Sequence, residues 1–206
     1  MTKSPIPYPR FPGFDVMEQA KHWDQVTREL VESRLQPPDG DSFFSLSERA
    51  VAATLCDQLT GQHEDPRIPV VQMIETRLAA NRTDGWHHAD LPPDRRTWQQ
   101  SLRNLDADAH EAHGTDFPTC SLDQQAQVLT SIQKTSGLWH GLRADEVWNL
   151  WMRYVCAAFY SHPWAWNEIG FPGPAYPRGY KNIGMNRRES FEVGQEHPEQ
   201  GPVPHQ

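Results

Sequence analysis

The sequence predicts an all-α protein: a small irregular bundle of five or six helices with long N- and C-terminal coil arms. Apolar residues recur at helical spacing in several segments between residues 15 and 160, and no useful stretch alternates as a strand does. Serine-led capping boxes and proline or glycine mark the ends of these segments. We therefore divide the chain into an N-terminal arm and amphipathic helix (1–40), a helical core (41–161), and an aromatic, proline-rich strap with a solvated tail (162–206).

The N-terminal division holds an arm and one expected helix. Residues 1–14 are rich in proline and aromatic residues, so we expect them to be extended. Between Asp15 and Leu35 the apolar spacing predicts a single amphipathic helix with Asp15 as its N-cap. Its expected apolar face consists of Val16, Ala20, Trp23, Val26, Leu30 and Val31. A Pro-Pro-Asp-Gly-Asp linker at residues 37–41 ends it.

The core opens with three expected helices. Ser45 and Glu48 form a capping box for a helix that runs to about Leu59 and closes at Gly61. A second helix covers residues 70–80, and a third starts at Pro92-Pro93 and extends to about His113. The expected inward residues are Leu46, Val51, Leu55 and Leu59; Val70, Val71, Ile74 and Leu78; and Trp98, Leu102, Leu105 and Ala109.

Two further helices complete the core. Ser121 and Gln124 form another capping box, for a helix through Ile132 whose expected stripe is Leu122, Ala126, Leu129 and Ile132. The segment 146–160 is apolar nearly all round, which is typical of a helix surrounded by neighbours. At about 14 residues, with Arg153 inside it, this segment is too short and too polar to span a bilayer. His162-Pro163 is expected to stop it.

The residues after this helix are expected to form an aromatic coil stiffened by four prolines between residues 163 and 177. Rings in a coil must lie on a surface, either that of this protein or that of another chain, and the two are compatible. Large rings on rigid coil are also typical of interface hot spots. We take as candidate partner-binding residues Trp164, Trp166, Phe171, Tyr176, Arg178 and Tyr180.

Three sequence runs here are characteristic: Phe-Tyr-Ser-His-Pro at 159–163, Trp-Asn-Glu-Ile-Gly at 166–170 and Gly-Pro-Ala-Tyr-Pro-Arg-Gly-Tyr at 173–180. With the helix opening at 44–47 and the Asp-Phe turn at 116–117, they resemble the gluconate 2-dehydrogenase subunit 3 family. The resemblance covers roughly residues 43–184.

The resemblance implies a non-catalytic accessory subunit without an active site of its own. Such a subunit binds and stabilises a large FAD-dependent dehydrogenase subunit of the glucose-methanol-choline type, which oxidises a sugar or sugar acid such as gluconate. FAD is therefore expected in the partner, no cofactor is expected in this chain, and electrons leave through a cytochrome subunit or another acceptor. Many family members begin with a twin-arginine export signal, whereas this sequence has only Arg10 and no apolar run after it. We expect a cytoplasmic complex, or a periplasmic, membrane-associated one if it is exported with a partner.

Composition and missing motifs exclude other classes. A net charge of −8 argues against nucleic-acid binding, which needs a basic face. The sequence contains no dinucleotide-binding GxGxxG after a strand and no Walker loop. Three widely spaced cysteines, Cys56, Cys120 and Cys156, are too few for a cysteine-rich metal or haem site, although spacing leaves one disulfide open.

Two alternatives to the accessory role remain at the sequence level. Asp106, His110 and His113 share one face of a helix and are suitable zinc ligands, which indicates a stand-alone metal-dependent enzyme. The run His-Glu-Ala-His at 110–113 is, however, one residue shorter than the HExxH metalloprotease pattern, and histidines also suit an exposed helix C-terminus. The other alternative is a generic helical scaffold for an unrelated partner.

Overall fold

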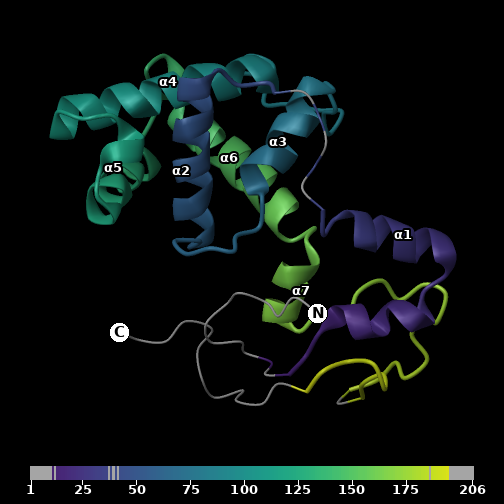
Figure 1. Cartoon of the computed structure of the whole chain (residues 1–206). Helices are drawn as coiled ribbons and strands as arrows, with labels where there is room; N and C mark the ends of the chain where they lie inside the picture. The colour runs from purple at the N-terminus through teal and green to yellow at the C-terminus, as the bar shows by residue number, and fades with distance from the viewer. Residues whose placement is uncertain are drawn as a thin grey trace. The chain divides into compact units, whose positions relative to one another are not determined.

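The computed structural model describes residues 11, 13–36, 38, 40, 42–185 and 187–194, and this part of the chain is mostly helical (Figure 1). The prediction of an all-α protein is confirmed. The only described strands form a two-residue antiparallel hairpin in which Leu138 pairs with Arg143. In chain order the elements are η1 (Val16–His22), α1 (Gln25–Ser33), α2 (Leu46–Thr60), α3 (Val70–Ala79), α4 (Asp94–His113), η2 (Phe117–Thr119), α5 (Leu122–Lys134), β1 (Leu138–Trp139), β2 (Leu142–Arg143), α6 (Ala144–Phe159) and α7 (Pro163–Ile169).

These elements belong to two units. The described residues of unit 1 come from 1–36, 66–68 and 160–206, and those of unit 2 from 37–65 and 69–159. Unit 1 therefore joins segments from both ends of the sequence, with η1 and α1 from the N-terminal side and α7 from the C-terminal side.

Unit 2 is a five-helix bundle built around α6. This helix contacts α2, α3, α4 and α5, as its nearly all-round apolar sequence predicts. Eleven of the twelve largest fully buried side chains among the described residues lie in unit 2. They are Leu55, Ile74, Leu78, Trp98, Leu102, Leu105, Phe117, Ile132, Leu150, Trp151 and Tyr154.

Local sequence signals fix the helix ends of unit 2 as predicted. The Ser45 hydroxyl accepts from the Glu48 amide at 3.2 Å, and the Glu48 carboxylate accepts from the Ser45 amide at 3.1 Å. Ser121 and Gln124 form the second reciprocal pair. Gly61 ends α2 in the left-handed region, with φ 66°.

Some predicted inward positions are wrong. Leu46 and Leu122, which directly follow the capping serines, are 90% and 54% exposed. Ala126 is also exposed, and Gln125 and Val128 take the buried face of α5 instead. The side-chain amide of Gln125 offsets its burial by donating to the carbonyl oxygens of Phe117 and Cys120.

The single helix predicted from Asp15 to Leu35 is wrong as well, because the chain forms η1 and α1 with an extended residue, Trp23, between them. Asp15 caps η1 as predicted, but Asp24 starts a new helix by accepting a hydrogen bond from the Thr27 amide at 2.9 Å. The break rotates the two apolar stripes relative to each other. Val26 and Leu30 are therefore exposed, whereas Val16, Trp23 and Val31 are buried.

The C-terminal division also departs from the prediction. The helix of residues 146–160 ends at Phe159, as expected before His162-Pro163, but the residues after it form the short helix α7 rather than coil. The expected solvated tail is described only in residues 187–194, most of which are exposed or half-buried. The Glu189 side chain is buried and accepts hydrogen bonds from the backbone amides of Lys181 and Asn182. Residues 1–10 and 12 of the expected N-terminal arm 1–14, and the end of the chain, 195–206, lie outside the described residues.

Candidate partner-binding surface

All six candidate partner-binding residues lie in unit 1, in the C-terminal segment 160–185 that contains α7 (Figure 1). A proline at the first helical position and a cap before it explain why this segment starts a helix. Pro163 needs no helical hydrogen bond there, and His162 Nδ1 accepts one from the Trp164 amide at 3.2 Å. Gly170 ends the helix with φ 66°.

The side chain of His162 is 2% exposed, and this burial lowers its pKa to about 4. At neutral pH the ring is therefore uncharged, and its Nδ1 lone pair is free to accept the capping hydrogen bond. The sequence predicts His162-Pro163 as the stop of the preceding helix, not His162 as a cap. Its position directly before a proline at N1 was the signal for a cap.

Trp166 faces the core of unit 1. It packs with Val16, Trp23 and Val31, and its indole N–H donates to the Tyr160 carbonyl oxygen at 2.6 Å. The Arg34 guanidinium lies 5.6 Å from the centroid of the Trp166 ring. Trp166 thus attaches the C-terminal segment to the core of unit 1.

Two hydrogen bonds also join the N-terminal elements to the C-terminal segment. The Val16 amide donates to the buried Asn167 Oδ1 at 2.8 Å, and Arg34 Nη1 donates to the Ser161 carbonyl oxygen at 3.1 Å. Gly173 then passes tightly under Trp23, because a Cβ atom there would lie 2.4 Å from the indole ring. Segment 160–173 is therefore fixed against η1 and α1 by hydrogen bonds and by close packing.

Exposed apolar groups are concentrated in the segment that follows α6. Nine of the thirteen exposed large hydrophobic side chains in the described chain belong to unit 1. Seven of the nine follow α6 in the sequence: Tyr160, Ile169, Phe171, Tyr176, Tyr180, Ile183 and Met185. Because exposed apolar groups are concentrated on one segment, this segment is a candidate interaction site. We name these seven residues the strap surface.

Two of the six candidates have mainly internal contacts within unit 1. The Trp164 ring packs edge-on against His162. Arg178 donates from Nη1 to Gln19 at 3.0 Å and stacks over Phe191 at 3.8 Å, beside a pocket of about 300 Å³. Burial lowers the pKa of Arg178. The rings of Phe171, Tyr176 and Tyr180 are the members of the candidate set that remain exposed.

Residues 47–173 match the model of the family described as gluconate 2-dehydrogenase subunit 3, which is more than half of the chain. The chain belongs to the gluconate 2-dehydrogenase subunit 3 family. No curated protein and no solved structure matches the chain significantly. The family match includes α7 and Phe171 and ends at Gly173, before Tyr176 and Tyr180. Family membership supports an accessory role in a dehydrogenase complex.

In this member of the family the proposed metal ligands do not form a site. Asp106 Oδ1 accepts from the Phe117 amide at 2.8 Å, which makes it a structural partner of η2. His110 Nδ1 lies 3.5 Å from the Asp116 carboxylate, and both side chains are exposed. Among the described residues, no three histidine, cysteine, aspartate or glutamate side chains are grouped so that they could hold a metal ion.

Two further sequence questions are answered by the described residues. Cys56, Cys120 and Cys156 are all free thiols, and burial raises the pKa of Cys56 and Cys120. None of the described helices combines the length and the apolar character that crossing a membrane requires.

Proposed function

We propose that this chain is a non-catalytic accessory subunit that binds and stabilises a large FAD-dependent dehydrogenase subunit of the glucose-methanol-choline type. The large subunit holds FAD and oxidises a sugar or sugar acid such as gluconate, and a cytochrome subunit or another acceptor takes the electrons. The complex is cytoplasmic, or it is periplasmic and membrane-associated if this chain is exported together with its partner.

The observation that carries the proposal is the strap surface, whose segment is anchored over residues 160–173. Tyr176 and Ile183 are 65% and 83% exposed, whereas Trp166 and Asn167 in the anchored part are buried. Pre-ordered rings lose little conformational entropy when a partner covers them, which favours tight binding. Tyrosine is also among the residues that contribute most at interface hot spots. Family membership indicates that the partner is another subunit of a dehydrogenase complex.

The stabilising effect follows from mass action. A protein that binds only the folded large subunit raises the stability of that subunit by RT ln(1 + [L]/Kd), about 2.7 kcal/mol at a hundredfold excess over Kd. We therefore expect the large subunit to carry more FAD and to melt at a higher temperature when this chain is present.

The first test is whether the neighbouring reading frame encodes a large flavoprotein with a dinucleotide fingerprint, and the second is co-expression of that flavoprotein with this chain. We expect the two chains to co-purify, and the Tyr176→Ser/Ile183→Ser double variant to bind about tenfold more weakly or worse, as loss of two interface contacts predicts. Leu46→Ser is the matched control, because Leu46 is 90% exposed but lies in unit 2. A large subunit that alone is fully soluble, flavin-loaded and active would contradict the proposal.

A further inference from the structure

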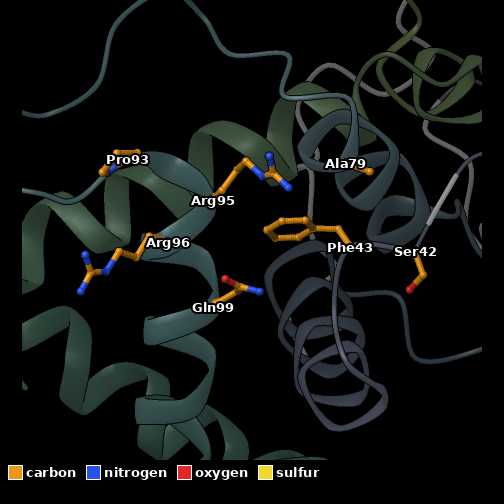
Figure 2. A pocket seen from close by; sticks show the side chains of 7 residues that line it. All are labelled: Ser42, Phe43, Ala79, Pro93, Arg95, Arg96 and Gln99. Atoms are coloured by element: carbon orange, nitrogen blue, oxygen red, sulfur yellow. The ribbon is translucent and has the colours of Figure 1, made fainter.

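Unit 2 contains an open pocket of about 710 Å³ at the beginning of α4 (Figure 2). Its walls come from three elements: the first turns of α4, the end of α3, and the residues before α2. The lining residues are Ser42, Phe43, Ala79, Pro93, Arg95, Arg96 and Gln99. The site thus combines two cations, an amide and a hydroxyl with an aromatic ring.

The side chain of Arg95 is exposed and contacts the ring of Phe43. Its guanidinium lies over the Phe43 ring, 4.9 Å from the centroid. Figure 2 shows Arg95 and Gln99 reaching toward Phe43, while Arg96 extends away from the ring. A contact between a guanidinium and an aromatic ring leaves N–H groups of the guanidinium available to bind a carboxylate.

Within the described residues, neither Arg95 nor Arg96 forms an ion pair or side-chain hydrogen bond. The acidic groups nearby are already occupied. Asp94 accepts from Arg153 and Tyr154, while Glu75, which accepts from Ser42, pairs with Arg49 at 3.0 Å. Among the residues that the structure describes, the positive charge of this pocket is therefore uncompensated, in a chain whose net charge is −8.

We propose that this pocket binds an acidic segment of the large subunit, with a carboxylate on the Arg95 guanidinium and a neighbouring apolar side chain on Phe43. The inference rests on the proposed function, and it adds a charged contact in unit 2 to the aromatic contact in unit 1. A pocket of about 710 Å³ is many times larger than one water or one small ion needs, so a peptide segment fills it better than a free anion. A planar, bidentate pair also gives the contact a defined direction.

The probe is the peptide acetyl-Gly-Asp-Phe-Glu-Gly-amide, titrated into the isolated full-length chain and followed by the backbone amide NMR signals. We expect shifts at Phe43, Ala79 and Gln99, and none with the Gly-Asn-Phe-Gln-Gly analogue. Arg95→Gln is expected to weaken binding about tenfold, as loss of a charged, bidentate pair predicts. Arg95→Lys keeps the charge but lacks the planar, two-pronged donor geometry of a guanidinium. Its affinity for the peptide is therefore expected to lie between those of the wild type and Arg95→Gln. Arg82→Gln, an exposed arginine of unit 2 outside the pocket, is the control and leaves binding unchanged.

Three outcomes overturn the inference: equal binding of the amide analogue, complete displacement by inorganic phosphate at equal concentration, or peptide binding only after Asp39→Asn/Asp41→Asn substitution. The last outcome means that the chain fills the pocket with its own residues. The same variants separate this inference from the proposed function. If Arg95→Gln does not weaken co-purification and the wild-type chain does not bind the peptide, only the inference about the pocket is refuted. Peptide binding without any association with the flavoprotein refutes the accessory role.

Discussion

At the scale of single residues, two buried polar groups stabilise the structure around them through hydrogen bonds. His162 is the first: it caps α7 only because its ring stays neutral. Protonation of a buried imidazole costs solvation energy, and the proton also occupies or disturbs the acceptor that the Trp164 amide uses.

This burial predicts a pH dependence of stability. The pKa of His162 is lowered from 6.5 to about 4 in the folded chain, so between these values the unfolded chain binds the additional proton. Stability present above pH 6.5 is therefore lost as the pH falls toward 4, by about 3 kcal/mol at most. His162→Asn keeps a good N-cap and removes the titration. Urea unfolding at pH 7 and pH 5 should show a smaller loss for the variant than for the wild type, and equal losses would refute the assignment.

The second buried polar group is Asp94, whose Oδ2 accepts from Arg153 Nη2 at 3.0 Å and from the Tyr154 hydroxyl at 2.7 Å. Burial and this hydrogen bond raise the pKa of Tyr154. Asp94→Asn removes the buried anion of this pair and leaves Arg153 only its second carboxylate, Asp84, which lies 3.0 Å away. We expect the variant to lower the free energy of unfolding by about 3 kcal/mol, the low end for a broken buried pair. Asp145→Asn removes an exposed carboxylate from Arg143 and should change the urea midpoint little. A similar small effect at Asp94 would show that the buried pair is not stabilising.

At the scale of elements, the sequence predicts those helix ends that depend on neighbouring residues. Ser45 with Glu48 and Ser121 with Gln124 form the expected caps, because a capping box needs residues only three positions apart. The helical stripe of Trp98, Leu102, Leu105 and Ala109 is likewise buried as predicted.

The missed elements are those in which one residue had two possible roles. Asp24 lies inside an apolar stripe but caps α1, and Pro163 stops α6 but also starts α7. Side-chain capping competes with continuation of a helix, and periodicity alone does not show which prevails. Proline has the same ambiguity, since it is excluded from a helix interior yet favoured at the first position.

Close packing of the strap segment under Trp23 gives an element-scale prediction. Gly173 has φ 76°, and a Cβ there would lie 2.4 Å from the indole, so Gly173→Ala adds a steric clash to the backbone cost. Gly179→Ala is the matched control, because Gly179 has φ 68° and an added Cβ meets no atom within 4 Å. We expect Gly179→Ala to cost about 1 kcal/mol and Gly173→Ala clearly more. Limited proteolysis should then cut Gly173→Ala faster within residues 171–185.

Should the two glycine variants be cut at the same rate, the contact with Trp23 does not hold the segment. Intrinsic tryptophan fluorescence gives an independent readout, because Trp23 and Trp166 lie in the core of unit 1 and are buried. Their emission should shift to longer wavelength in Gly173→Ala alone.

At the scale of the whole molecule, the all-α class and the central position of α6 follow from the sequence, but the pairing of distant residues does not. Asn167 binds the amide of Val16 across 151 positions, and Asp94 binds Tyr154 across 60. No periodicity encodes such contacts. For the candidate surface, the ring-rich sequence indicates the segment and its residues Tyr176 and Tyr180. It does not indicate that Trp166 points inward, because that orientation depends on η1, which is distant in the sequence.

The separation into units predicts that the bundle folds without the strap. The fragment 37–159 contains all eleven of the large, fully buried side chains of unit 2, and its helices retain their caps. We expect it to show a helical circular dichroism spectrum and cooperative urea unfolding, and to bind the acidic peptide as the full chain does. Its affinity for the large flavoprotein should fall, because the strap surface is missing. The fragment 37–146 is the control: it loses Leu150, Trp151 and Tyr154 from α6, so it should not unfold cooperatively. A fragment 37–159 without cooperative unfolding would mean that the bundle depends on unit 1 for its stability, and full affinity for the flavoprotein would place the partner contact outside the strap surface.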